Sequence, residues 1–208
     1  MRLVLISDTH DMHDLVEVPD GDVLVHAGDL TMAGDVHSCQ KALDWLNNQP
    51  HKHVVLTAGN HDFAFEREWA KRQLDLGRII YLENNGTAID GVTFWGSPVQ
   101  PWFMSWAFNV HRGAPIKEFW DKIPNSVDVL ITHGPPWGIL DQARRYRSDH
   151  LGCEELAKRV EYVNPVIHVF GHIHGSAGIE HRGKTQFINA SVVDEAYKMS
   201  NEPIVVEI

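Results

Sequence analysis

Five apolar segments of this 208-residue chain each end in a short polar motif that contains Asp, Asn or His, often beside a glycine. The segments are short and rich in β-branched residues, as is typical of buried strands. Because the carboxyl ends of parallel strands meet at one edge of a sheet, this recurrence predicts that the polar side chains gather at a single site. In chain order, the segments and their motifs are 3–7 with Asp8-Thr9-His10, 23–27 with Gly28-Asp29, 53–58 with Gly59-Asn60-His61-Asp62, 127–132 with His133-Gly134-Pro135-Pro136, and 166–170 with Gly171-His172-Ile173-His174.

The stretches between these strands contain helices in some places and hairpins in others. Apolar residues at helical spacing predict helices at about residues 35–48, 63–76 and 151–163, with a shorter helix near 116–123. Asp90-Gly91 and Arg182-Gly183-Lys184 each separate two strand-like runs, which indicates hairpins. We therefore expect one α/β domain over residues 1–208, with two mixed β-sheets packed face to face and flanked by helices.

Composition limits the classes of function. The net charge is −10 with the histidines neutral, so a strong general affinity for nucleic acid is not expected. No apolar run approaches the roughly 20 residues that cross a bilayer. The two cysteines, Cys39 and Cys153, fall on apolar faces of predicted helices, which favours buried thiols and a cytoplasmic location. A cluster of Arg144, Arg145 and Arg147 either forms a solvated helix face or lines the approach of an anionic substrate.

The polar motifs contain the donors of a metal site. Asp, His and Asn without cysteine form a hard-to-borderline ligand set that suits Mn, Fe or Zn. Asp29 is the natural carboxylate to bridge two ions, and the whole set is large enough for a two-metal site. Each side chain taken singly could be a hydrogen-bonded core residue, but the full set favours metal binding. His13, His26 and His168 are interpreted as ordinary histidines.

In this order, D-x-H, G-D, G-N-H-[ED], H-G-P-P and G-H-x-H resemble the motifs of the calcineurin-like metallophosphoesterase superfamily. Further stretches look similar to the metallophosphoesterase-domain-containing proteins known from animals, and this closer resemblance covers nearly the whole chain. The superfamily resemblance implies a four-layer α/β/β/α sandwich, in agreement with the two sheets expected above. The closer resemblance is carried by Ser97-Pro98, Pro101-Trp102-Phe103, residues 152–156 and residues 187–191.

The resemblance also implies roles for the motif residues. His61 matches the histidine that, in the superfamily, contacts the phosphate and can protonate the leaving group. The implied reaction is in-line attack on phosphorus by a hydroxide that bridges the two metal ions. The implied metal ligands are Asp8, His10 and His174 for the first ion, Asn60, His133 and His172 for the second, and Asp29 for both.

Two departures from the superfamily pattern affect this expectation. Superfamily protein phosphatases read G-D-x-x-D-R-G, whereas here Gly28-Asp29 is followed by Leu30-Thr31-Met32-Ala33-Gly34. The aspartate that orients the catalytic histidine is therefore missing, which argues against a protein phosphatase and leaves the orientation of His61 unexplained. Some animal relatives have glycine at the first histidine of G-H-x-H and bind nucleoside monophosphates with poor turnover. His172 is present here, so a complete second metal site is expected.

An aromatic-rich stretch has two interpretations. It either packs in the core or an interface, or it forms a stacking wall for a nucleobase. The aromatic residues concerned are Trp95, Trp102, Phe103, Trp106 and Phe108.

Together these observations predict a cytoplasmic, dinuclear-metal phosphodiesterase for small phosphodiesters, and the family resemblance adds cyclic nucleotides as candidate substrates. The alternative from another class is a regulatory protein that binds nucleoside monophosphates and turns them over slowly. Among enzymes, a phosphomonoesterase and a nuclease remain open. The sequence does not identify the metals, the natural substrate or the oligomeric state.

Overall fold

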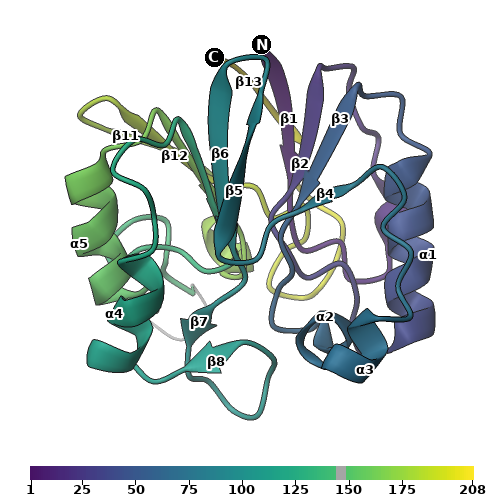
Figure 1. Ribbon diagram of the computed structural model, residues 1–208, viewed down its shortest axis with the longest axis horizontal. Coiled ribbons are helices and arrows are strands. Elements are labelled where there is room, and N and C mark those ends of the chain that lie inside the picture. The colour runs from purple at the N-terminus through teal and green to yellow at the C-terminus, as the bar shows by residue number, and fades with distance from the viewer. Residues whose placement is uncertain (144–148) are drawn as a thin grey trace.

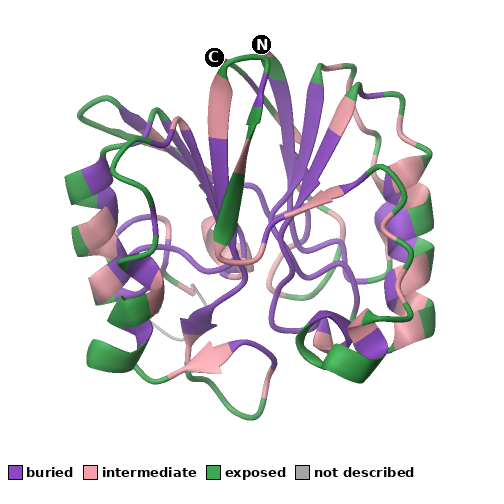
Figure 2. Cartoon of the chain, viewed as in Figure 1, coloured by how far each residue is buried: buried purple, intermediate pink, exposed green. Residues whose placement is uncertain are grey.

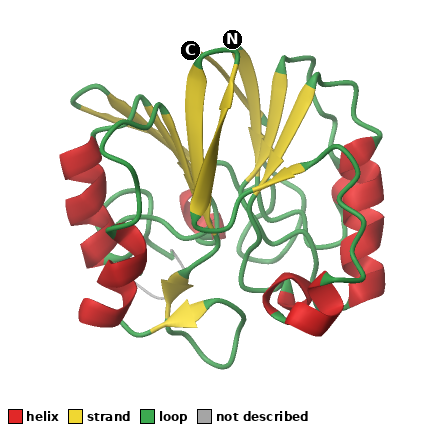
Figure 3. Cartoon of the chain, viewed as in Figure 1, coloured by secondary structure: helices red, strands yellow, loops and turns green. Residues whose placement is uncertain are grey.

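The computed structural model describes residues 1–143 and 149–208 and has two large β-sheets between two layers of helices (Figure 1, Figure 3). A small third sheet pairs β7 (Gln100–Pro101) with β8 (Asn109–Val110). Helix α1 (Val36–Asn47) covers one outer face, and α4 (Ala114–Trp120) and α5 (Glu154–Val163) cover the other. Both large sheets contain parallel and antiparallel neighbours. The predicted α/β/β/α sandwich of two mixed sheets is confirmed.

The first sheet has five strands in the order β13-β1-β2-β3-β4. The strands from β1 to β4 are parallel, and β13 pairs antiparallel with β1. The first three polar motifs therefore lie together at the carboxyl ends of these parallel strands. The strands are β1 Arg2–Ile6, β2 Val23–His26, β3 His53–Leu56, β4 Ile80–Tyr81 and β13 Ile204–Glu207.

The second sheet has six strands in the order β11-β12-β10-β9-β6-β5. Its four inner strands are parallel, and each edge strand is the antiparallel hairpin partner of its neighbour. The two hairpins confirm the turns predicted at Asp90-Gly91 and Arg182-Gly183-Lys184. The strands are β5 Asn85–Ile89, β6 Val92–Ser97, β9 Val129–Thr132, β10 Ile167–Phe170, β11 Gly178–Arg182 and β12 Thr185–Asn189.

Both faces of the central strands are buried, as Figure 2 shows. Along β1, Leu3 and Leu5 pack in the core between the two sheets, whereas Val4 and Ile6 pack in the core under α1. A third core lies between the second sheet and helices α4 and α5. Because a strand alternates its side chains, an unbroken apolar run such as this one fills two cores at once.

Helix α1 lies where the sequence predicts it. The side chain of Asp35 caps its first turn by accepting hydrogen bonds from the backbone amides of His37 and Ser38. Cys39 and Leu43 are fully buried against the first sheet. Both cysteines of the chain are buried and unpaired.

The helix predicted over residues 63–76 is wrong in its extent. The structure has two short helices, α2 (Phe63–Glu66) and α3 (Glu68–Lys71), separated by Arg67 in extended backbone. Phe65 and Ala70 are both buried in the core under α1. In one continuous helix these two residues would lie about 140° apart around the axis, so the break allows both to reach the same core.

The helix predicted over residues 151–163 begins later, at Glu154. The preceding residues are bonded to the loops after β9: the Leu151 amide donates to the Asp141 carbonyl, and the Cys153 amide donates to the Pro135 carbonyl. These bonds replace the first helical turn. None of the helices in residues 1–143 and 149–208 is long and apolar enough to span a membrane.

Candidate metal centre

The structure brings all seven predicted metal ligands together at the carboxyl ends of five parallel strands. Asp8 and His10 follow β1, and Asp29 follows β2. Asn60 follows β3, His133 follows β9, and the pair His172 and His174 follows β10. The three strands of the first sheet and the two of the second meet at this edge, so each sheet contributes part of the site.

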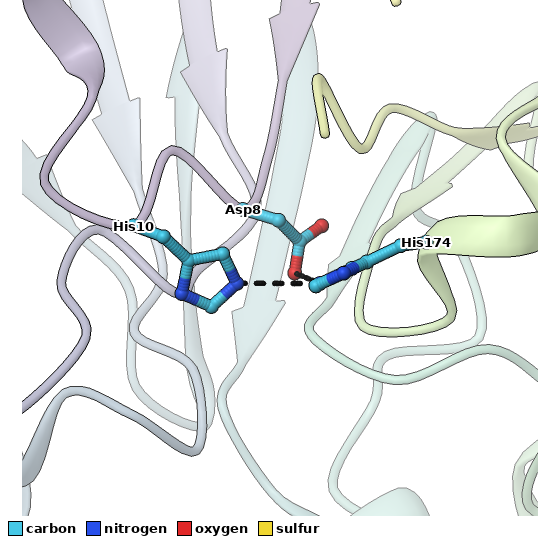
Figure 4. A group of neighbouring side chains, drawn as sticks. All are labelled: Asp8, His10 and His174. Atoms are coloured by element: carbon cyan, nitrogen blue, oxygen red, sulfur yellow. Dashed lines mark hydrogen bonds and ion pairs between the residues drawn. The ribbon is translucent and has the colours of Figure 1, made fainter. Parts of the chain in front are cut away.

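The first group consists of Asp8, His10 and His174 (Figure 4). The Nε2 atoms of His10 and His174 lie 3.2 Å apart, and His174 Nε2 lies 3.4 Å from Asp8 Oδ1. Asp8 also accepts hydrogen bonds from the backbone amide of His172, at 3.0 and 3.1 Å. This bond holds the end of β10 against the end of β1, although 164 residues separate the two in sequence.

The second group consists of Asp29, His133 and His172. His133 Nε2 lies 3.3 Å from Asp29 Oδ2 and 2.9 Å from Asn60 Oδ1. The rings of His133 and His172 contact each other edge to face, with centroids 5.0 Å apart. Asp29 Oδ2 also lies 3.8 Å from His10 Nε2, so this carboxylate stands between the two groups.

The hydrogen bonds of two histidines fit metal binding. The carbonyl of Thr31 lies 3.2 Å from His10 Nδ1, and the carbonyl of Ala27 lies 3.0 Å from His133 Nδ1. A carbonyl only accepts, so each Nδ1 carries a hydrogen and each Nε2 faces the site, where it offers a lone pair whenever the ring is neutral. Lone pairs of nitrogen and oxygen then face one another at distances near 3 Å and repel each other. A bound cation would remove this repulsion.

The charges in the site depend strongly on one another. Burial opposes protonation of His133, but the nearby Asp29 carboxylate outweighs this and raises the pKa of His133 to about 9. Burial lowers the pKa of His172 to about 3, which favours the neutral, metal-binding form of that ring. Burial would raise the pKa of Asp8, but the hydrogen bond and charge of His174 reverse the shift and lower it. A proton or a metal ion can therefore satisfy the same cluster of acceptors.

Four of the seven residues have left-handed backbone conformations, which are uncommon outside glycine. Their φ angles are 58° at Asp8, 43° at His10, 55° at Asp29 and 66° at His172. Such conformations persist where surrounding structure enforces them, and they concentrate at functional sites.

Close packing between the motifs requires glycine at two positions. A Cβ atom at Gly59 would lie 2.3 Å from the Asp29 amide nitrogen, and one at Gly171 would lie 2.1 Å from Asp8 Oδ2. The glycines of G-N-H-D and G-H-x-H therefore allow neighbouring motifs to approach each other. Glycine stands beside the ligands because any larger side chain would clash with the neighbouring motif.

Sequence reasoning gave no role to Asp62, the last residue of G-N-H-D. Its buried carboxylate accepts four hydrogen bonds: from the Gly59 amide at 2.8 Å, the Leu30 amide at 3.2 Å, and the amide and hydroxyl of Thr31 at 3.1 Å each. Burial, with the charge of Asp29, raises the pKa of Asp62 to about 7. The four donors favour the ionised form. Asp62 thus ties the loop after β2 to the loop after β3.

His61 lies beside both metal-ligand groups. Its ring is buried, and its Nδ1 lies 2.8 Å from the carbonyl oxygen of Met32. His61 also forms a close cluster with His10 and Asp29. The orientation that the sequence left unexplained therefore comes from a backbone carbonyl in the segment that departs from G-D-x-x-D-R-G.

The aromatic residues considered together in the sequence separate into two sets. Trp95 and Phe108 are buried in cores on opposite sides of the sandwich, which confirms the packing interpretation for these two. Trp102, Phe103 and Trp106 lie in the loop from β7 (Gln100–Pro101) to β8 (Asn109–Val110) and line a cavity at the site.

This cavity has a volume of about 430 Å³, and Asp29, Asn60, His61 and His172 contribute to its lining. Tyr197, which no sequence motif indicated, also lines it, and its ring contacts those of His10 and His174 at centroid distances of 4.9 and 5.0 Å. Arg144, Arg145 and Arg147 lie outside the described residues.

The fold and the site define a class: an α/β/β/α sandwich with a cluster of candidate metal ligands at the carboxyl ends of strands from both sheets. A family model for calcineurin-like phosphoesterases matches residues 1–176. The chain belongs to the calcineurin-like phosphoesterase family.

Individual relatives agree with this assignment. Metallophosphoesterase domain-containing protein 1 of Homo sapiens is 38% identical over 231 residues, a match that covers 100% of this chain and 71% of the relative. The UPF0046 protein K07C11.7 of Caenorhabditis elegans is 38% identical over 219 residues, covering 99% of this chain and 74% of the relative. The solved structure of phosphopantetheinyl hydrolase from Mycobacterium tuberculosis is similar in fold, with a TM-score of 0.63 at 15% identity over 94% of this chain and 90% of that one.

Proposed function

We propose that this protein is a dinuclear-metal phosphodiesterase that acts on small phosphodiesters, cyclic nucleotides being candidates. The observation that supports this most strongly is the pair of ligand groups with Asp29 between them and His61 beside both. The first ion would be held by Asp8, His10 and His174 and the second by Asn60, His133 and His172, with Asp29 shared. The donors are oxygen and imidazole nitrogen, which suit Mn, Fe or Zn.

Two metal ions bound here would lower the pKa of an attacking water and neutralise charge on the phosphate. The chain's own residues would do the rest. Asn60 is a neutral oxygen donor and leaves the site less negative toward an anionic substrate. His61 faces the cavity and would protonate the departing oxygen. The cavity of about 430 Å³ fits a small phosphoester or a nucleotide.

The compartment and the substrate class are proposals of the same kind. The buried, unpaired thiols of Cys39 and Cys153 fit a reducing cytoplasm. Metallophosphoesterase domain-containing protein 1 of Homo sapiens, whose match covers this whole chain, is named for that domain, which agrees with phosphoester chemistry without specifying a diester.

The experiment is to strip the protein of metal, reload it separately with Mn, Fe, Zn or Mg, and assay each form against cyclic nucleotides, acyclic diesters and monoesters. We expect about two ions per chain by elemental analysis and the highest kcat/KM on diesters. Full activity at one ion per chain would contradict the two-metal mechanism. A consistent preference for monoesters would replace the diesterase proposal with a phosphomonoesterase.

The rival function is a nucleotide-binding protein with low turnover, which the aromatic lining of the cavity would also suit. His172→Gly separates the two. If His172 completes the second ligand group, its loss should cut hydrolysis about 100-fold or more while calorimetry still detects binding of a nucleoside monophosphate. His181→Gly, at an exposed position on β11, serves as the matched control. Unchanged hydrolysis in His172→Gly would show that His172 is not a working ligand and would remove this support for the enzyme. Tight binding of a nucleoside monophosphate with negligible hydrolysis by the parent would favour the binding protein.

A further inference from the structure

The segment that holds His61 is the one that departs from the pattern of the protein phosphatases. In Gly28-Asp29-Leu30-Thr31-Met32-Ala33-Gly34, Met32 stands where G-D-x-x-D-R-G has its second aspartate. Met32 is 44% exposed, and its hydrogen bond with His61 does not involve the side chain. The contact is made by its main-chain carbonyl, which accepts a hydrogen bond of 2.8 Å from His61 Nδ1.

The carbonyl of Met32 is fixed by bonds on both sides of it. The Met32 amide donates to Asp11 Oδ2 at 2.9 Å, and the Thr31 amide donates to Asp62 Oδ1 at 3.1 Å. Further along, the carbonyl of Gly34 accepts a hydrogen bond of 2.8 Å from the Ala64 amide, three residues after His61. The acceptor for His61 is therefore part of a loop that is itself held in place.

The face of the His61 ring is covered by Trp106. The two ring centroids lie 4.0 Å apart at an interplanar angle of 35°, and Phe63 stacks on the same indole at 6.0 Å and 28°. The backbone beside Trp106 is anchored to the site, because the Ala107 amide donates to the carbonyl of Asn60 at 3.0 Å. The indole is half-buried and lines the cavity together with His61.

We propose that His61 is positioned by the main-chain carbonyl of Met32 and the indole of Trp106, and that Trp106 is therefore a positioning residue for the proton-donating histidine. This inference rests on the proposed role of His61 as the acid. The carbonyl keeps a hydrogen on Nδ1 and directs Nε2 away from Met32. The proton given to the leaving oxygen is therefore the one on Nε2 of the doubly protonated ring, and its transfer leaves the neutral ring with hydrogen on Nδ1. The indole restricts rotation of the ring about its side-chain bonds. Positioning of this kind affects the transfer of the proton and leaves the other requirements of the reaction in place.

The first test uses diesters whose leaving alcohols differ in acidity. His61→Ala should reduce kcat about 10²- to 10⁴-fold for alkyl leaving groups and much less for 4-nitrophenolate, which needs no proton. Trp106→Leu should reproduce this dependence more weakly, with a loss of about 10- to 100-fold for alkyl leaving groups. Trp106→Phe should recover most of that loss.

A double-mutant cycle separates failure of this inference from failure of the proposed function. If Trp106 acts through His61, Trp106→Leu should have almost no further effect on kcat in the His61→Ala background. A full additional loss there would overturn the positioning role and make Trp106 a substrate contact. Equal loss across all leaving groups in His61→Ala alone would overturn the acid role of His61 itself.

A measurement without turnover provides the second readout. In Zn-loaded protein labelled with ¹⁵N-histidine, the His61 ring should show the tautomer with hydrogen on Nδ1, and its carbon-bound protons should carry a ring-current shift from the indole. Trp106→Leu should abolish the shift, whereas Trp69→Leu, at a tryptophan that is 64% exposed, should leave it unchanged. Hydrogen on Nε2 alone, or a shift that survives Trp106→Leu, would contradict the proposed contacts.

Discussion

Asp62 illustrates how one buried carboxylate can organise several metal ligands without binding metal. Its partner Gly59 directly precedes the predicted ligand Asn60. Its partners Leu30 and Thr31 are the first and second residues after the predicted ligand Asp29. Thr31 also accepts from His10 through its carbonyl. Three ligands from three loops, His10, Asp29 and Asn60, are therefore indirectly held by a single side chain.

This arrangement predicts an unusual result for a conservative substitution. All four groups that contact Asp62 are donors, so an amide NH₂ would face N–H or O–H groups and could replace only the bonds of one oxygen. Asp62→Asn should therefore weaken metal binding about as much as Asp62→Ala, by about 10- to 100-fold in affinity measured by calorimetry. Asp44→Asn, at an exposed carboxylate on α1, is the control. Metal affinity at the parent level in Asp62→Asn would show that the carboxylate charge is not needed.

At the scale of elements, the site depends on how closely the ends of β1 and β10 approach each other across the two sheets. The bonds from the His172 amide to Asp8 join these two ends directly. A bridge between Ser7 and Ser191 joins the end of β1 to the segment after β12, the strand beside β10. Gly171 lies at the contact, where an added Cβ would stand 2.1 Å from Asp8 Oδ2 and 2.2 Å from Ser7 Oγ.

We expect Gly171→Ala to separate the two strand ends and so to weaken the first metal-ligand group. Asp8 follows a strand of one sheet and His174 follows a strand of the other. A small separation of the two strand ends therefore moves these two ligands apart. Metal affinity measured by calorimetry should fall by about 10- to 100-fold. Gly134→Ala is the matched control, since it also lies at a strand end but its Cβ would meet only Gln100 at 3.9 Å. Equal affinity in the two variants would contradict the role of this contact.

At the scale of the whole molecule, buried neutral histidines link folding to pH. His168 on β10 is fully buried with its Nε2 2.9 Å from the Thr132 hydroxyl, and burial lowers its pKa from 6.5 to about 3. His26 on β2 has a similar contact with the hydroxyl of Thr9, at 3.1 Å, and burial lowers its pKa to about 3 as well. Both threonine hydroxyls also donate to carbonyls in the ligand loops.

The sign of the pH effect follows from the lowered pKa. Below pH 6.5 the unfolded chain binds a proton at His168, whereas the folded protein does not until about pH 3. Stability is therefore lost as the pH falls below 6.5, by about 1.4 kcal/mol per pH unit for each such group. We predict that, between pH 6 and pH 4, His168→Gln lowers the slope of the unfolding free energy against pH by about 1.4 kcal/mol per pH unit. Urea unfolding of chelator-treated parent and variant at several pH values checks it, and parallel curves would contradict it.

The sequence by itself determined the strands, the class of fold and the residues that gather at the site. Long apolar runs that end in Asp, Asn or His indicate both a buried strand and the polar edge beyond it, because strand burial and ligand chemistry both depend on side-chain type. The family likeness added the four layers. The single helix predicted over residues 63–76 was wrong, because helical spacing does not reveal that Phe65 and Ala70 pack in the same core.

Only the tertiary structure decided which groups hold the ligands in place. Every residue carries the same backbone carbonyl, so no side-chain pattern could indicate that Met32 is the acceptor for His61. The contact between Asp8 and His174 joins residues from different sheets, and the donors around Asp62 are almost all backbone amides. Side-chain type follows from the sequence, whereas the positions of backbone donors and acceptors are fixed only when distant strands pack together.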